Sequence, residues 1–251
     1  MKFVYQSAEL WKQKSHDFYD ILSHIERCGR ICYKSKSDLT KETAIKFNEM
    51  ICKRKHFSVQ EHAELVLDSD KCRFKQCFGD ADVGGEFHTN FRRFHQRITL
   101  RIMAGDYSCV EEAYNDLMIP DAVRWRRSVH IITDRATAQQ LTRHRVFSFS
   151  MESQRYCNYK GGLEFIEQEG LKDKNDLLER IERSYQEDVN NGVRPEIARA
   201  ILPNCTKTEL VMTGYFSDWK RFLNERLEES TGKVSPTMKE LASKIKTAIW
   251  H

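Results

Sequence analysis

The sequence predicts an α/β (α+β) fold in which helices surround a mixed or antiparallel sheet. Segments with apolar residues at helical spacing are interleaved along the chain with short runs rich in β-branched and apolar residues. These segments do not follow the short regular period of a doubly wound parallel sheet. No stretch rich in Pro, Gly or Ser divides the chain. The 251 residues are therefore predicted to form a single domain, 1–251.

The first half of the chain is predicted to contain helices, strands and one long insertion. Apolar residues recur at helical spacing within 8–55, which predicts two amphipathic helices. The runs at 63–67 and 129–133 have the composition of strands. An insertion at about 70–125 lies between them, and its pattern at 110–118 predicts a helix. Because so long a connection is uncommon, we expect a functional lid or an accessory element.

The second half has clearer boundaries between elements. An Asn-Asn-Gly sequence at 190–192 ends a helix, because glycine readily adopts the left-handed conformation that follows a helix. Pro195 and Pro236 favour first helical turns, and Ser235 is a suitable N-cap. Together with apolar spacing, these signals predict helices over 177–189, 195–203, 219–227 and 238–249 and a strand over 208–213.

Composition excludes several classes of protein. The 41 Lys and Arg against 37 Asp and Glu give a net charge of +4, too mild to indicate nucleic-acid binding through bulk charge. No run approaches ~18 consecutive apolar residues, and the first residues lack the pattern of a signal peptide, so we expect a cytoplasmic protein without membrane association. The eight cysteines include no Cys-x-x-Cys pair and no four convergent ligands, which predicts free thiols and no metal site.

The most informative cluster is Arg143-His144-Arg145, at the end of a helix predicted over about 135–143. The two guanidiniums and the imidazole between them cannot all lie on one buried face. Arginine suits bidentate recognition of phosphate or of a planar carbonyl. A serine-rich loop follows at 148–153 and adds hydroxyl donors. The cluster predicts a site for a phosphorylated ligand with a polar ring. The alternative is a solvated cap, because cations at a helix C-terminus complement its dipole.

The Arg143-His144-Arg145 triplet is followed by seven further residues, then by Ser153 and then by Arg155-Tyr156. This pattern resembles the signature of flavin-dependent thymidylate synthases. The resemblance holds in order and spacing over roughly 1–68 and 128–250. It also includes segments of the same family at 56–62 (HFSVQEH), 198–203 (ARAILP), 213–226 and 238–242 (MKELA).

The resemblance implies an enzyme that reductively methylates dUMP to dTMP, with FAD as cofactor and with NADPH and methylenetetrahydrofolate as co-substrates. It also implies a homotetramer with active sites shared between subunits. The flavin ligands it implies are Ser58 of a neighbouring subunit, Arg143, His144, Arg145, Tyr215, Ser217 and Arg221. The dUMP ligands it implies are Gln140, Arg143, Glu152, Ser153, Gln154, Arg155, Arg226 and, from another subunit, Arg199. Arg226 is implied as the catalytic residue.

The chemistry of these residues agrees with the implied roles. A dianionic phosphate favours two or more arginines, which Arg155 and Arg199 supply. A guanidinium at Arg226 would stabilise charge that develops on the pyrimidine. Ser153 has no adjacent His or Asp to activate it, so we expect a ligand and not a nucleophile. Glu152 lies one residue later than the family's carboxylate, and Tyr215 replaces an Asn. These departures leave open a related modification of a pyrimidine monophosphate, such as hydroxymethylation.

Two further patterns have competing interpretations. His56 and His62 could be a pair of metal ligands, but the sequence offers no third ligand near them. We therefore favour the interpretation that both residues lie at the start of a strand beside a cofactor pocket. Arg93, Arg97 and Arg101 would form one stripe of a helix, which indicates a solvated face or an oligomer contact more often than a nucleic-acid patch. A non-enzymatic nucleotide- or RNA-binding protein that uses this basic insertion is therefore the alternative from another class.

Overall fold

The computed structural model describes two compact units, which we treat separately. Unit 1 comprises Met1–Trp11, Ile31–Ser35 and Ser128–His251, and unit 2 comprises Lys12–Arg30 and Lys36–Arg127. The sequence predicts that both units belong to one domain, and this stays a prediction. No helix among the described residues is long and apolar enough to cross a membrane. The described residues are 1–15, 17–68, 71, 82–83, 86–119, 125–230 and 232–250.

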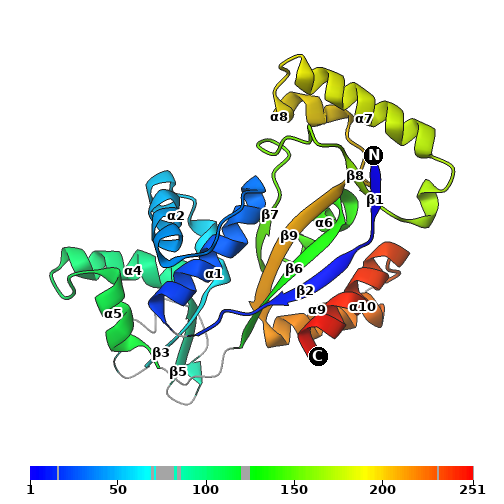
Figure 1. Ribbon diagram of the computed structural model, residues 1–251. Helices are drawn as coiled ribbons and strands as arrows, with labels where there is room; N and C mark the ends of the chain where they lie inside the picture. The colour runs from blue at the N-terminus through cyan, green and yellow to red at the C-terminus, as the bar shows by residue number, and fades with distance from the viewer. Residues whose placement is uncertain are drawn as a thin grey trace. The chain divides into compact units, whose positions relative to one another are not determined.

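Unit 1 is built on a four-stranded sheet with the strand order β2-β6-β9-β7 (Figure 1). Strand β2 pairs antiparallel with β6, and β7 pairs antiparallel with β9. A separate parallel pair is formed by β1 and β8. The predicted α/β class with antiparallel pairing is confirmed. The strands are β1 (Lys2–Val4), β2 (Ser7–Trp11), β6 (Arg126–Asp134), β7 (Ser148–Met151), β8 (Glu164–Ile166) and β9 (Lys207–Tyr215).

Three helices cover the apolar face of this sheet. Val129 and Ile131 of β6 and Leu210 and Met212 of β9 are alternate residues and point to one side, where all four are fully buried. They pack in one cluster with apolar residues of the helices α6, α9 and α10. As predicted, the Ser235 side chain accepts a hydrogen bond from the first turn of α10. The helices are α6 (Arg135–Leu141), α9 (Phe216–Leu227) and α10 (Pro236–Trp250).

A second cluster of unit 1 packs beneath α7 (Asn175–Asn190). This helix ends before Gly192, whose φ of 84° is the left-handed conformation that the sequence predicted. The chain then forms α8 (Pro195–Ala198) and a 3-10 helix, Arg199–Ile201. The predicted helix over 195–203 is therefore shorter and tighter than expected.

Unit 2 begins with the helices α1 (Phe18–Arg30) and α2 (Lys41–Arg54) and contains a sheet with the order β3-β5-β4. Its described residues 86–119 form β5 (Glu86–Asn90), α4 (Phe91–Met103) and α5 (Val110–Leu117). These elements supply most of the buried aromatic rings of the core that α1 and α2 share. The described part of the insertion thus covers apolar faces of α1 and α2, and its role as a lid or an accessory element stays a prediction. The other strands are β3 (Glu64–Asp68) and β4 (Asp82–Val83).

Two segments differ from the sequence predictions. The stretch 8–55 does not begin with a helix, because Ser7–Trp11 is the strand β2 with alternating burial. The predicted serine-rich loop contains the strand β7, in which Ser148 and Ser150 are buried opposite Thr213 and Val211. Both strands are short and contain polar residues, so they lack the apolar composition by which the other strands were recognised.

His62 of unit 2 gives a prediction about stability. The residue is 1% exposed, and burial lowers its pKa to about 3, with additional contributions from His24 and Arg126. The unfolded chain therefore binds a proton near the ordinary pKa of 6.5 that the folded unit does not take up until about 3. As the pH falls through this range, we expect His62 to lower the free energy of unfolding by up to about 1.4 kcal/mol per pH unit. Urea denaturation at about pH 7 and about pH 5 should show a smaller loss for His62→Gln than for the wild type. Equal losses would contradict the role of His62.

Candidate functional site

The Arg143-His144-Arg145 triplet lies in a turn that leaves the C-terminus of α6. The helix begins at a well-formed cap, because the Asp134 carboxylate accepts hydrogen bonds from the Thr137 backbone N–H (2.8 Å) and hydroxyl (2.7 Å). The helix ends at Leu141, whose carbonyl accepts the backbone N–H of His144 at 3.0 Å. The helix therefore ends two residues before its predicted end at about 143. We call residues 142–147 the RHR turn.

The Arg143, His144 and Arg145 side chains of the RHR turn do not share one buried face, as the sequence predicted. Arg143 and Arg145 are exposed, whereas the His144 side chain is only 11% exposed. Within the described part of the chain, neither arginine forms an ion pair with a carboxylate. Two guanidiniums with no acidic partner can bind an anion without breaking an internal contact. Gln140, at the last turn of α6, is exposed beside them.

His144 joins the RHR turn to α9 through Arg226. The Nε and Nη2 atoms of Arg226 lie 3.1 and 2.7 Å from Nε2 of His144. On the other side of the ring, Nδ1 lies 3.6 Å from Oε2 of Glu225. Burial lowers the pKa of His144, as does the positive charge of Arg226, while Glu225 raises it. The imidazole is therefore neutral near pH 7, and the partly buried position predicted for Arg226 is confirmed.

Phe147 anchors the RHR turn to the core of unit 1. Its ring packs edge-on against Trp219 with a centroid distance of 4.7 Å. A Cβ atom on Gly214 would lie 2.3 Å from a Phe147 ring carbon, so only glycine allows this approach. The close packing of strand β9 on Phe147 fixes the turn relative to the start of α9.

The predicted flavin residues Tyr215, Ser217 and Arg221 lie around the first turns of α9. The Tyr215 backbone N–H donates to the Asp218 carboxylate at 3.1 Å, which caps the helix. Ser217 is exposed. Arg221 pairs with Glu225 at 3.0 Å, one helical turn further on. Tyr215 is therefore the N-cap of the helix that also carries Ser217, Arg221 and Arg226.

The second part of the site is the turn at 152–156, which follows β7. The backbone N–H groups of Glu152 and Ser153 donate to the carbonyls of Glu209 (2.8 Å) and Cys32 (3.1 Å). These bonds hold the turn against the sheet. Ser153 itself is partly exposed, and no histidine among the described residues contacts its hydroxyl. This agrees with the predicted role of Ser153 as a ligand and not as a nucleophile.

Two buried polar atoms of this turn have no hydrogen-bond partner within the described residues. Glu152 is 1% exposed, and its Oε1 accepts the Tyr159 hydroxyl at 2.6 Å while its Oε2 is unsatisfied. Gln154 is 8% exposed, and its Nε2 is unsatisfied. An unsatisfied buried amide or carboxylate costs free energy, so both atoms point to an additional partner.

Arg155 extends from this turn toward α8. Its Nε lies 3.1 Å from Oε2 of Glu196, and Arg194 binds the other oxygen of the same carboxylate at 2.8 Å. Arg199 follows Glu196 by three residues and is exposed. It forms no ion pair within the residues that the structure describes. The structure thus places Arg155 and α8 side by side within one chain.

Ser58 lies in unit 2 and is an exposed residue of the 3-10 helix Phe57–His62. It is the predicted site residue that unit 1 does not contain. The sequence reasoning missed Glu225, Glu196 and Tyr159, which contact predicted site residues. Of these, only Glu225 had a signal in the sequence, since it lies four residues after Arg221 on the same helix face.

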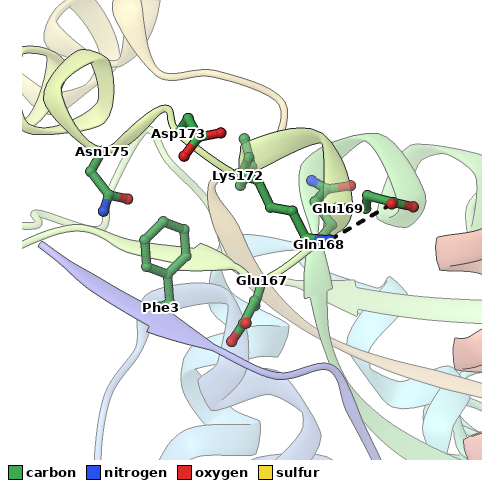
Figure 2. A pocket seen from close by; sticks show the side chains of 8 residues that line it. Phe3, Glu167, Gln168, Glu169, Lys172, Asp173 and Asn175 are labelled. Atoms are coloured by element: carbon green, nitrogen blue, oxygen red, sulfur yellow. Dashed lines mark ion pairs between the residues drawn. The ribbon is translucent and has the colours of Figure 1, made fainter.

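A cavity of about 690 Å³ in unit 1 contains none of the predicted site residues (Figure 2). Phe3 of β1 and the segment 167–175 line it. Figure 2 shows Glu167, Glu169 and Asp173 around it, with Lys172 paired to Glu169. This acidic lining does not suit a phosphate ligand.

The described residues contain no group of three or more His, Cys, Asp or Glu side chains that could hold a metal ion. Cys72 and Cys77 lie outside the described residues, and the six described cysteines form no disulfide with one another. The groups that the site offers to a ligand are the cations, amides and hydroxyls of the RHR turn, the 152–156 turn and α9.

Comparisons with known proteins find a family that matches the second half of the chain. Residues 127–248 match the family described as thymidylate synthase complementing protein. A flavin-dependent thymidylate synthase of Corynebacterium efficiens is 32% identical over 117 residues, which cover 38% of this chain and 46% of the relative. One of Pyrococcus furiosus is 34% identical over 105 residues, which cover 38% of this chain and 43% of the relative. The matched region spans less than half the length of these curated relatives.

Two solved structures of a UMP/dUMP methylase, PolB from Streptomyces cacaoi, align with 99% of this chain. The methylase was bound with 5-Br dUMP in one structure and with 5-Br UMP in the other. The alignments cover 91% and 90% of the methylase chains and have TM-scores of 0.46 and 0.48 at 14% identity. The assignment rests on the sequence matches. Residues 127–248, which include every predicted site residue except Ser58, match the thymidylate synthase complementing protein family, and the curated relatives of this chain named above are flavin-dependent thymidylate synthases.

Proposed function

We propose that this chain is a flavin-dependent thymidylate synthase that reductively methylates dUMP to dTMP. Methylenetetrahydrofolate would donate the carbon, FAD would be the bound redox cofactor and NADPH the reductant. The observation that carries the proposal is the family match over 127–248, which contains the RHR turn, the 152–156 turn and Arg226 in one continuous region.

The RHR turn fits a flavin dinucleotide. The exposed guanidiniums of Arg143 and Arg145 have no acidic partner among the described residues and suit the pyrophosphate of FAD. Tyr215, Ser217 and Arg221 would add contacts from the start of α9. A bound flavin would supply the hydride chemistry, and this chain would hold and orient it. Ser58 would contribute from a neighbouring subunit.

The 152–156 turn fits a nucleoside monophosphate. Arg155, with Arg199 from another subunit, would bind the phosphate, while the unsatisfied Gln154 Nε2 and Glu152 Oε2 would find partners on the nucleotide. Gln140, Arg143 and Ser153 would complete the dUMP site. Arg226 would lie over the pyrimidine, where its N–H groups stabilise negative charge as carbon 5 is activated.

The proposal includes a cytoplasmic homotetramer, because Ser58 and Arg199 would each act in the active site of another subunit. Light scattering at working concentrations should give the mass of four chains. A monomer would contradict the shared site, since Ser58 and Arg199 could then reach only their own chain.

A turnover assay tests the function directly. The purified protein should bind FAD, seen as flavin absorbance, and should form dTMP from dUMP, methylenetetrahydrofolate and NADPH. Absence of flavin absorbance after incubation with excess FAD would refute the proposal. Formation of a hydroxymethyl product instead of dTMP would favour the related pyrimidine modification. RNA binding without any flavin would favour the non-enzymatic alternative.

Arg155→Ala should weaken dUMP binding by roughly ten- to hundred-fold, because a hydrogen bond to a charged group contributes about 1.5–3 kcal/mol. The FAD content should change little. Isothermal titration with dUMP measures the affinity. Arg194→Ala is the matched control, since Arg194 binds the same Glu196 carboxylate but lies outside the 152–156 turn. A comparable loss in both variants would contradict a direct role of Arg155.

A further inference from the structure

Glu225, His144 and Arg226 form a continuous chain of polar contacts between α9 and the RHR turn. Oε2 of Glu225 lies 3.6 Å from Nδ1 of His144. Nε2 of the same ring faces Nη2 and Nε of Arg226 at 2.7 and 3.1 Å. The Phe222 ring packs edge-on against the imidazole with a centroid distance of 4.9 Å, which limits rotation of the ring.

These contacts define the tautomer of His144. Arginine has five N–H donors and no acceptor, so the two Arg226 groups that face Nε2 require an unprotonated nitrogen there. The proton of the neutral ring is then on Nδ1, where the Glu225 carboxylate attracts it from 3.6 Å. Such a pair of partners, one on each nitrogen, orients an imidazole in both tautomer and rotation.

The contacts use only part of the Arg226 guanidinium. Of its five N–H groups, one on Nε and one on Nη2 are directed to His144, and three remain on the other edge. An arginine side chain has several rotatable bonds, so an isolated guanidinium on a helix surface samples many positions. An acceptor fixed in the neighbouring turn removes most of this freedom.

We propose that His144, oriented by Glu225, is a positioning residue that holds the guanidinium of Arg226 for its role on the pyrimidine. This inference rests on the function proposed above for Arg226. His144 would act through Arg226, in addition to any contact with the flavin that the resemblance implies. Preorganised donors stabilise a transition state most when they need not reorganise during the reaction.

The positioning depends on the charge of the imidazole. An imidazolium cannot accept a hydrogen bond and would repel Arg226. The charged groups that act on His144 are Arg226, Glu225 and Arg221, all on α9, and Arg143 and Arg145 flank it within the RHR turn. Glu225 raises the pKa of His144, and Arg226 and Arg221 lower it. Removing each neighbour should therefore move the titration in a known direction.

The contact can be tested without substrate by nitrogen-15 NMR of the histidine rings in the full-length protein, with His144→Gln used to assign the signals. We expect a neutral ring with the proton on Nδ1. Arg226→Gln and Arg221→Gln should shift the titration of His144 to higher pH, and Glu225→Gln should shift it to lower pH. Glu228→Gln, an exposed carboxylate on the residue that follows α9, is the matched control and should cause no shift. A proton on Nε2, or an Arg226→Gln variant with an unchanged titration, would overturn the contact.

Kinetics test what the contact does. The kcat for dTMP formation should fall as the pH drops through the titration of His144, and Glu225→Gln should move this limb to lower pH. His144→Gln should abolish the limb and lower kcat per bound flavin by about ten- to hundred-fold, the cost of a hydrogen bond to a charged group. A variant that loses flavin but keeps full turnover per bound flavin would overturn the positioning role. If the wild type forms no dTMP, the proposed function fails, while the NMR result still decides the contact.

Discussion

Arg226→Lys is expected to lower the turnover of dUMP to dTMP by about 10²–10³-fold, the usual effect of losing one preorganised donor to a developing oxyanion. Lysine keeps the positive charge but has no planar fork of N–H groups. It cannot both donate to Nε2 of His144 and present two parallel donors to a ring carbonyl and ring nitrogen. The affinity for dUMP should change much less than kcat, because the phosphate contacts remain.

The experiment measures kcat, the dissociation constant for dUMP and the rate of flavin reduction by NADPH. Flavin reduction should survive in Arg226→Lys, because that half-reaction develops no charge on a pyrimidine. Arg183→Lys on α7 is the matched control, since Arg183 is exposed and far in sequence from the site residues. Near-normal dTMP formation by Arg226→Lys would show that Arg226 is only a surface cation of α9.

Much of unit 1 could be predicted from the sequence because local signals there agree with the final structure. Gly192 ends α7, Ser235 caps α10, and the apolar spacing of α9 correctly placed Arg226 beside its buried face. The Arg143-His144-Arg145 triplet was predicted at the end of a helix; the structure places it in the turn that follows α6, with both arginines exposed and His144 largely buried. In each case a single residue or a regular spacing determines the geometry.

The remaining features depend on contacts that are distant in sequence. The strands β2 and β7 are short and polar, and they form because β6 and β9 offer them free edges. The pairing of His144 with Arg226 joins residues 82 positions apart. The buried amide of Gln154 gave no signal in the sequence that it would lack a partner.

The core of unit 1 gives the second prediction of large effect. Trp219 is fully buried and has the largest side chain of that core. It packs against Phe147 at 4.7 Å and Phe222 at 5.9 Å, both edge-on. Phe147 belongs to the RHR turn, and Phe222 packs on His144. Trp219 therefore supports both the fold and the proposed flavin site.

Trp219→Ala should lower the free energy of unfolding of unit 1 by about 3–5 kcal/mol, the usual cost of truncating a large aromatic residue in a core. This is a large fraction of the about 5–15 kcal/mol that stabilises a typical domain. Trp219→Phe keeps much of the volume and should remain folded for measurement. Urea denaturation followed by far-UV circular dichroism gives the values for both variants.

The matched control is Trp250→Ala, which removes the same side chain from a position that is 39% exposed at the end of α10. Its loss of stability should be much smaller, because less apolar surface returns to water and no closed cavity is left. We also expect Trp219→Phe, and not Trp250→Ala, to weaken FAD binding, since the smaller ring no longer holds Phe147 and the RHR turn shifts. If the two alanine variants lose equal stability, Trp219 is not the centre of this core. If Trp219→Phe binds FAD with wild-type affinity, the RHR turn keeps its position without the support of Trp219, and its backbone contacts to α6 would then account for its geometry.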